Sequence, residues 1–103
     1  MPAERILIVG TIRISPGSLE RARPAMAAMI HASRKEPGCL AYSYAEDVIE
    51  PGLVRVTEIW ESRAALSAHF ASDHLRQWRE SWETIGVRDR RLHAYAIGEA
   101  EET

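Results

Sequence analysis

Cysteine is nearly absent from this sequence, because Cys39 is the only one among 103 residues. A single cysteine forms neither an intramolecular disulfide nor a cysteine-based zinc cluster, so side-chain packing must stabilise the fold. Long apolar runs are missing too, since the stretch from Ile6 to Ile12 is far shorter than the ~20 residues that cross a bilayer. No basic segment precedes that stretch, as it would in a signal peptide. We therefore expect a cytoplasmic protein that makes no contact with membranes.

An excess of charge of one sign is also absent. Lys and Arg number 13 against 15 Asp and Glu, which gives a net charge of −2, and the basic residues are spread among the acids. Such a distribution offers no patch for a polyanion. The sequence has no glycine-rich loop that could cradle a phosphate, and no Cys, His and Asp arrangement typical of acyl transfer. We expect no nucleic-acid partner and no nucleotide, flavin or other cofactor.

The chain is short and undivided. It has 103 residues and a mass of 11.6 kDa, with no Gly-, Ser- or Pro-rich stretch long enough to separate two domains. We expect one domain over residues 1–98, followed by a short acidic, frayed tail at 99–103. A domain of this size buries only about 60–65% of its unfolded surface, so a partner subunit would stabilise it.

Apolar periodicity and turn residues predict four strands and three helices. Period-two runs rich in β-formers predict the strands, and apolar residues three and four apart predict the helices. The predicted strands cover residues 5–15, 39–46, 53–60 and 90–97. The predicted helices are capped by Ser18, Ser62 and Asp73 and end near 35, 71 and 85. Pro24 should bend the first helix or loosen its first turn, because proline lacks a backbone N–H.

This order of elements, βα, ββ and αβ, predicts an α+β fold of the ferredoxin-like βαββαβ type, with an antiparallel sheet and helices on one face. The first strand carries apolar side chains on both faces, with Ile6 and Ile8 on one and Leu7 and Val9 on the other. The last strand repeats this pattern. Both faces should therefore be covered, which predicts a homodimer joined through its sheets.

Short motifs are spread through residues 36–78. They are Glu36-Pro37-Gly38-Cys39-Leu40 followed by Tyr42, then Glu58-Ile59-Trp60-Glu61-Ser62, Ala65-Leu66, His69 and Ser72-Asp73-His74. In these residues the chain resembles the antibiotic-biosynthesis monooxygenase (ABM) family, which includes small quinol monooxygenases. The resemblance implies a dimeric α+β barrel with a pocket between sheet and helices in each protomer. Some members oxygenate electron-rich phenols or hydroquinones with dioxygen and need neither metal nor flavin.

His69 is the first candidate for a catalytic base. An oxygenase without a cofactor must deprotonate its substrate, because a phenolate donates an electron to dioxygen far better than a phenol does. A histidine with its ordinary pKa of ~6.5 is mostly neutral at physiological pH and can take that proton. His69 lies beside the apolar stripe of its short helix, between Leu66 and Phe70, and could face the sheet. The alternative is a buried histidine with a structural role only.

Glu58 is the second catalytic candidate. It shares one face of its strand with Val54, Val56 and Trp60, and a carboxylate on such an apolar face needs a partner. If that partner is His69, Glu58 would orient the base. The alternatives are a purely structural pair or a salt bridge to an arginine.

The predicted substrate-binding residues are aromatic or lie close to His69. Trp60 could form the floor of an aromatic pocket or simply belong to the core. Phe70 and Tyr44 complete the predicted walls, although Tyr42 and Tyr44 fit the dimer interface better than the pocket. His74 either lines the pocket or faces solvent. Trp78 and Trp82 have the spacing of core residues.

The histidines do not have the spacing of a helical metal site. His69 and His74 are five residues apart instead of four, and Ser72-Asp73 should interrupt the helix between them. We therefore predict no metal ligands.

These features predict a cofactor-independent monooxygenase that acts with dioxygen on a small phenol, hydroquinone or polyketide-like aromatic. A non-catalytic dimeric module that binds a small molecule, or an accessory protein, remains the alternative. Haem binding and degradation, found in a branch of similar proteins, is disfavoured. That branch uses an Asn on the first strand, where this sequence reads Val9-Gly10-Thr11, and has a Trp where His69 stands.

Overall fold

The secondary structure follows the predicted order. The computed structural model describes residues 4–103, so the first three residues of the predicted domain lie outside the described residues. The elements are β1 (Arg5–Ile14), the 3-10 turn η1 (Pro16–Ser18), α1 (Leu19–Arg34), β2 (Cys39–Glu46), β3 (Leu53–Trp60), α2 (Arg63–Phe70), α3 (Asp73–Glu80), α4 (Trp82–Ile85) and β4 (Val87–Ile97). The acidic residues at 99–103 belong to no helix or strand.

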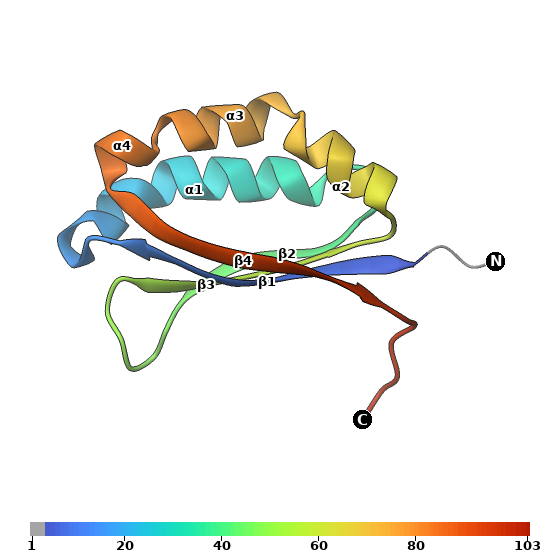
Figure 1. The fold of residues 1–103 in the computed structure, drawn as a ribbon. Helices are drawn as coiled ribbons and strands as arrows, with labels where there is room; N and C mark the ends of the chain where they lie inside the picture. The colour runs from blue at the N-terminus through green and yellow to red at the C-terminus, as the bar shows by residue number, and fades with distance from the viewer. Residues whose placement is uncertain (1–3) are drawn as a thin grey trace.

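The sheet is antiparallel, with strand order β2-β3-β1-β4, which confirms the ferredoxin-like α+β fold. All of the helices lie over one face of this sheet, and the β2–β3 hairpin loop reaches beyond the opposite face (Figure 1). On β3, Glu58 is paired with Tyr42 of β2 on one side and Ile8 of β1 on the other. Glu58 therefore lies in the middle of the helix-covered face.

The hydrophobic core fills the space between this face and the helices. Isoleucines at alternate positions of β1, from Ile6 to Ile14, are buried there against Met29 of α1 and Trp78 of α3. On the other face, Leu7 and Val9 are half-buried and Tyr95 is 52% exposed. The outer face of the protomer thus carries apolar side chains, and its expected cover by a second copy stays a prediction.

The first helix differs from its prediction at two points. Pro24 neither breaks α1 nor delays its start, because α1 is continuous from Leu19 to Arg34. The hydrogen bond that Pro24 cannot donate would end at the carbonyl of Glu20, which lies on the exposed side of the helix. Ser18 precedes the helix without capping it, because its Oγ accepts a hydrogen bond from the Arg21 guanidinium.

The last predicted helix is two helices. α3 and α4 are separated at Ser81, whose hydroxyl donates to the carbonyl of Trp78. The cap of α3 is Ser72 instead of Asp73, since the Ser72 Oγ accepts from the backbone N–H of Leu75. No helix within residues 4–103 is long and apolar enough to span a membrane.

A register shift in β2 changes which side chains face the helices. The pairing with β3 shifts between Cys39 and Ala41, so Leu40 is left in a bulge and is 50% exposed. Beyond the bulge, Tyr42 is buried among Trp60 and His69, and Tyr44 stacks on Tyr42. Both tyrosines therefore lie on the helix-covered face, and their predicted place in a dimer interface is wrong.

β4 begins at Val87, earlier than the predicted residue 90. Its pairing with β1 continues past a register shift, through Arg13 with Arg88 and Ile14 with Val87. Asp89 has a φ of +52° near this irregularity. Gly86, with a φ of +76°, ends α4 and lets the chain turn into the strand.

Candidate active site

His69 lies in the last turn of α2 and points into the protein. The helix begins where the Ser62 side chain accepts a hydrogen bond from the backbone N–H of Ala65, as the sequence predicts. This start places Leu66 and His69 on the buried face, and His69 is only 1% exposed. Its ring lies 4.6 Å from the Trp60 ring, measured between centroids. The expected orientation of His69 toward the sheet is confirmed.

The carboxylate that binds His69 is Glu36, which the sequence analysis named only as part of a family motif. Glu36 follows α1 in the turn that leads to β2, and its Oε1 lies 2.8 Å from His69 Nδ1. The side chain is 13% exposed. Gly38 in the same turn has a φ of +83°, and a Cβ there would lie 2.7 Å from the Cβ of Ala65. A glycine is therefore required where this turn passes the start of α2.

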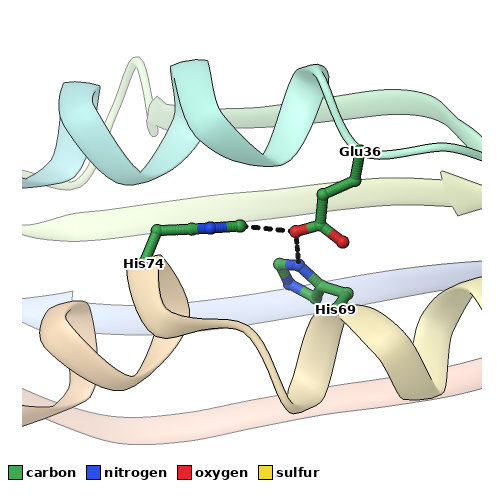
Figure 2. Close-up of side chains that lie close together, drawn as sticks. All are labelled: Glu36, His69 and His74. Carbon is green, nitrogen blue, oxygen red and sulfur yellow. Dashed lines mark hydrogen bonds and ion pairs between the residues drawn. The ribbon is translucent and has the colours of Figure 1, made fainter.

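Glu36 also binds His74, in the first turn of α3. Nε2 of His74 and Nδ1 of His69 both contact the same carboxylate oxygen, Oε1 of Glu36 (Figure 2). The side chain of His74 is 24% exposed, so His74 is not a fully solvated residue. A carboxylate accepts from both rings, so we assign the proton of neutral His69 to Nδ1. Nε2 of His69 is then unprotonated.

Nε2 of His69 faces the strand side of the site. The Tyr42 hydroxyl lies 3.4 Å from it and is the only group that donates to it among residues 4–103. Glu58 Oε1 is 3.9 Å away, too far for a direct hydrogen bond, and accepts from the Trp60 indole N–H at 3.0 Å. Glu58 is therefore bonded to Trp60, and its expected pairing with His69 is a 3.9 Å contact that is longer than a hydrogen bond. Residues two apart on a strand share a face, so Trp60 meets Glu58 first.

Burial sets the protonation states around His69. It lowers the pKa of His69, and the hydrogen bond to Glu36 opposes this effect. Burial raises the pKa of Glu58, while the bond from Trp60 partly offsets the rise. Burial also raises the pKa of Tyr42, and that of Tyr44 to about 12. At neutral pH the site therefore presents a neutral imidazole whose Nε2 has the protonated phenol of Tyr42 as its neighbour at 3.4 Å.

A small cavity of about 20 Å³ lies between sheet and helices beside His69. We call it the sheet–helix cavity. It is lined by Tyr42, Tyr44, Glu58, His69, Phe70, Leu75, Trp78, Arg79, Trp82, Arg90 and Leu92. Four of the predicted site residues, His69, Glu58, Tyr44 and Phe70, therefore share it. Trp60 stacks behind His69 instead, and His74 lines a separate groove of about 310 Å³ between α1 and α3.

The cavity is closed by movable side chains. Its volume suffices for about one water-sized molecule. Phe70, Arg79 and Arg90 are exposed, and the Arg79 guanidinium lies 5.8 Å from the centre of the Phe70 ring. An aromatic ligand can enter only when these exposed side chains move aside.

The cluster of Glu36, His69 and His74 is compact. One ligand-type atom from each lies within 4.8 Å of the others, as in a cation site. Both imidazole nitrogens are directed at the Glu36 oxygen itself, however, so that oxygen occupies the position that an ion would need. Hydrogen bonds therefore account for the cluster, and the predicted lack of metal ligands stays a prediction.

The fold and the buried histidine–carboxylate site together define the class: a ferredoxin-like α+β protein with an acid–base site between sheet and helices. Comparison with known families gives the assignment. The model of the family described as antibiotic biosynthesis monooxygenase matches residues 5–81, and the chain belongs to that family.

Individual relatives agree with the assignment. An uncharacterised protein of Synechocystis is 30% identical over 96 residues, which are 93% of this chain but only 65% of that relative's length. A candidate antibiotic biosynthesis monooxygenase of Deinococcus radiodurans superposes with a TM-score of 0.86 at 30% identity, covering 95% of this chain and 97% of the other. A Pseudomonas aeruginosa protein gives 0.80 at 26% identity, covering 96% and 98%. The likeness in fold therefore extends over nearly the whole chain.

Proposed function

We propose that this protein is a cofactor-independent monooxygenase that oxidises a small phenol, hydroquinone or polyketide-like aromatic with dioxygen. The observation that carries the proposal is the 2.8 Å contact of His69 Nδ1 with Glu36, which leaves Nε2 on the side of Tyr42 and Glu58, two residues that line the sheet–helix cavity. A base held in one tautomer by a carboxylate is the arrangement that proton abstraction needs. The Glu36–His69 pair takes the role that the sequence analysis gave to Glu58 and His69.

The chemistry begins with proton transfer. The substrate hydroxyl gives its proton to His69 Nε2, and the imidazolium that forms is stabilised by the Glu36 carboxylate at Nδ1. The phenolate then gives an electron to dioxygen, and the phenoxyl radical and superoxide combine into a peroxide. The peroxide takes back the proton held by His69, and water is then lost together with the hydrogen of the attacked ring carbon, which leaves a quinone. One oxygen atom ends in the quinone and the other in water, and the substrate supplies all four electrons.

The surroundings of His69 support this sequence of steps. A site of low polarity strengthens the pairing of the imidazolium with Glu36, because charges interact more strongly away from water. The phenols of Tyr42 and Tyr44 remain protonated and can donate hydrogen bonds to an anionic oxygen. Phe70 and Tyr44 offer flat apolar walls to an aromatic ring.

The size of the cavity favours one alternative function. About 20 Å³ is far less than an aromatic ring needs, which suits an accessory protein without an aromatic ligand better than an enzyme or a small-molecule-binding module with an open site. A haem group would need a still larger opening. The proposal of catalysis therefore requires that Phe70, Arg79 and Arg90 move when substrate binds.

We also propose that the protein is a cytoplasmic homodimer joined through the outer face of the sheet. The half-buried Leu7 and Val9 and the exposed Tyr95 form an apolar surface that a second copy would cover. Light scattering should give about twice 11.6 kDa, and Val9→Asp should weaken the assembly. A monomer at micromolar concentration would contradict the dimer. Cell fractionation would test the location.

Oxygen uptake is the decisive experiment for the function. Metal-stripped protein is mixed with a panel of hydroquinones, naphthols and anthrols, and oxygen consumption is recorded with product analysis. We expect uptake with at least one compound, and its loss in His69→Ala. The exposed His31 provides a matched control, so His31→Ala should retain the activity. Uptake that appears only after a metal is added back would contradict the cofactor-independent mechanism, and no uptake across the panel would favour the binding module.

A further inference from the structure

Two buried hydrogen-bond donors in the wall of the sheet–helix cavity form no hydrogen bond of normal geometry, although the Trp78 indole lies close enough to Tyr44 to lower the pKa of that phenol. Within residues 4–103, the only buried side-chain nitrogen or oxygen atoms without a hydrogen bond are Nε1 of Trp78 and Nε1 of Trp82. Both tryptophans line this cavity. Buried indole N–H groups are nearly always bonded, because an unpaired donor loses its hydration without compensation. Two such donors in one cavity wall indicate that something else binds them.

The tryptophans lie along a row of rings that begins at His69. The ring centroids are separated by 5.2 Å from His69 to Tyr42, 5.8 Å from Tyr42 to Tyr44, 6.2 Å from Tyr44 to Trp78 and 6.4 Å from Trp78 to Trp82. His69 is thus at one end of the row and Trp82 at the other. A ligand of aromatic size that contacts His69 would extend toward the tryptophans.

The wall of the cavity also contains charged side chains. Arg90 lines the cavity, and its guanidinium forms no ion pair with a carboxylate in the described part of the chain. Its positive charge lowers the pKa of Glu58 and so opposes the rise that burial causes. The His69 end therefore presents acceptors, the imidazole lone pair and Glu58. The tryptophan end presents donors.

We propose that the indole N–H groups of Trp78 and Trp82, assisted by Arg90, form a subsite for a second oxygen acceptor of the ligand, a carbonyl or a carboxylate on the far side of its ring. This subsite rests on the proposed function, because it takes the ligand hydroxyl to lie at His69. It narrows the ligand class to aromatics that carry oxygens at opposite ends.

The subsite also has a chemical purpose. When a carbonyl is conjugated with a phenol across the ring, deprotonation of the hydroxyl moves negative charge onto the carbonyl oxygen. Donors already directed at that oxygen bind the anion more strongly than the neutral phenol, which lowers the barrier to proton transfer. The two ends of the cavity would thus cooperate, with His69 removing the proton and the tryptophans stabilising the charge.

Three para-substituted phenols test the subsite by binding alone. 4-Hydroxyacetophenone carries a neutral carbonyl, 4-hydroxybenzoate an anionic carboxylate, and 4-isopropylphenol has a similar shape without an acceptor. Calorimetry should show that 4-hydroxyacetophenone or 4-hydroxybenzoate binds about three- to tenfold more tightly than 4-isopropylphenol, the gain expected for one or two hydrogen bonds. Comparing the first two probes shows whether the subsite prefers a carbonyl or a carboxylate.

Variants that remove only the N–H groups complete the test. Trp82→Phe and Trp78→Phe keep an aromatic ring, and each should abolish most of the preference while leaving the affinity for 4-isopropylphenol unchanged. Arg90→Gln should weaken the binding of 4-hydroxybenzoate more than that of the other two probes. Arg91→Gln is the matched control, because Arg91 is exposed and does not line the cavity. Thermal melts verify folding, and Trp82, which is only partly buried, should tolerate replacement better than Trp78.

The outcomes separate this proposal from the function on which it rests. Equal affinity for all three probes, equal losses for all three in the tryptophan variants, or no binding at millimolar concentration would overturn the subsite. These probes are poor electron donors and are not expected to be oxidised. Loss of the subsite together with retained oxygen uptake on a hydroquinone would leave the monooxygenase proposal standing. Selective binding without oxygen uptake on any compound would support the subsite and contradict the monooxygenase proposal.

Discussion

Two carboxylates flank His69, and they differ in almost every physical respect. Glu36 lies in a turn, is partly accessible, and binds two imidazoles through one oxygen. Glu58 lies in the middle of the sheet, is 4% exposed, and binds an indole N–H. Burial raises the pKa of Glu58. One carboxylate is suited to carry charge beside the base, and the other lies where a charge is costly.

The difference shows that proximity on a sheet does not decide which carboxylate orients a histidine. Each ring nitrogen has its own neighbour, and the nitrogen that donates a proton fixes the role of the other. Glu36 meets Nδ1, so Nε2 remains free for chemistry, whereas Glu58 lies on the Nε2 side, where a substrate would bind. Glu36 thus orients the base, and Glu58 shapes the cavity.

Removing His69 itself should have the largest effect, because both carboxylates act around it. His69→Ala should lower kcat/KM by roughly 10²–10⁴, the usual contribution of a positioned general base. In the wild type, efficiency should rise with pH through an apparent pKa below the ordinary histidine value, since burial lowers the pKa of His69 and the neutral form is active. The variant should lose this rise with pH, the acid limb, while staying folded and assembled, although the gap left at a buried residue should lower its melting temperature. If kcat/KM fell less than threefold and its acid limb were unchanged, His69 would only line the cavity and would not be the base.

Substituting each carboxylate in turn tests the comparison directly. Glu36→Gln should lower kcat/KM by roughly 10- to 100-fold, and this loss should largely disappear in a His69→Ala background, because coupled residues do not act additively. Glu58→Gln, the matched control on the other side of the ring, should change kcat/KM by less than about threefold. If Glu58→Gln gave the larger loss, or if the Glu36 and His69 losses were additive, the assignment of roles would be reversed.

The pH dependence of stability should distinguish the carboxylates independently of any substrate. A raised pKa means that the folded state holds the Glu58 proton more tightly than the unfolded chain does. This stabilisation is complete at pH values below the pKa of Glu58 in the unfolded chain, near 4.5. It is lost as the pH rises through the higher pKa that Glu58 has in the folded protein. In urea titrations from about pH 4.5 to 7, Glu58→Gln should therefore gain stability relative to the wild type as pH rises. A constant difference across this range would contradict the raised pKa.

The smallest effect should come from His74, which shares the Glu36 oxygen. His74 lowers the pKa of His69, so His74→Ala should move the acid limb of kcat/KM to higher pH by a fraction of a unit. The exposed His93 provides the control, and His93→Ala should leave the limb in place. A shift to lower pH would show that His74 supports the base instead of competing for its partner.

The fold was largely predictable because its signals are local. Alternating apolar residues in β1 and β3, the Glu50-Pro51-Gly52 turn and the Ser62 cap each determine their own element. The errors arose where tertiary packing outweighed local preference. One hydrogen bond lost at Pro24 did not interrupt α1, and the bulge at Leu40 moved Tyr42 onto the helix-covered face.

The site was predictable only in part. His69 and Glu58 could be found because a polar residue within an apolar stripe attracts attention. Glu36 could not, because it lies in a turn, where an exposed acidic residue is ordinary and no periodicity indicates its direction. It stands in one of the motifs that resemble the family, yet the motif by itself assigned it no partner. The pairing of Glu36 with His69 spans 33 positions and depends on how α1 and α2 pack.

The turn that carries Glu36 depends on Gly38, and this makes the site sensitive to substitution of a glycine. Any side chain there would press against Ala65 and Glu61 while forcing a positive φ on a residue that resists it. The turn would relax by shifting, and with it the carboxylate beside His69. In a survey of variants scored by turnover, Gly38 should therefore be about as intolerant as the base itself, although it lies outside the cavity. Selection on the chemistry would then act on a residue that has no functional group at all.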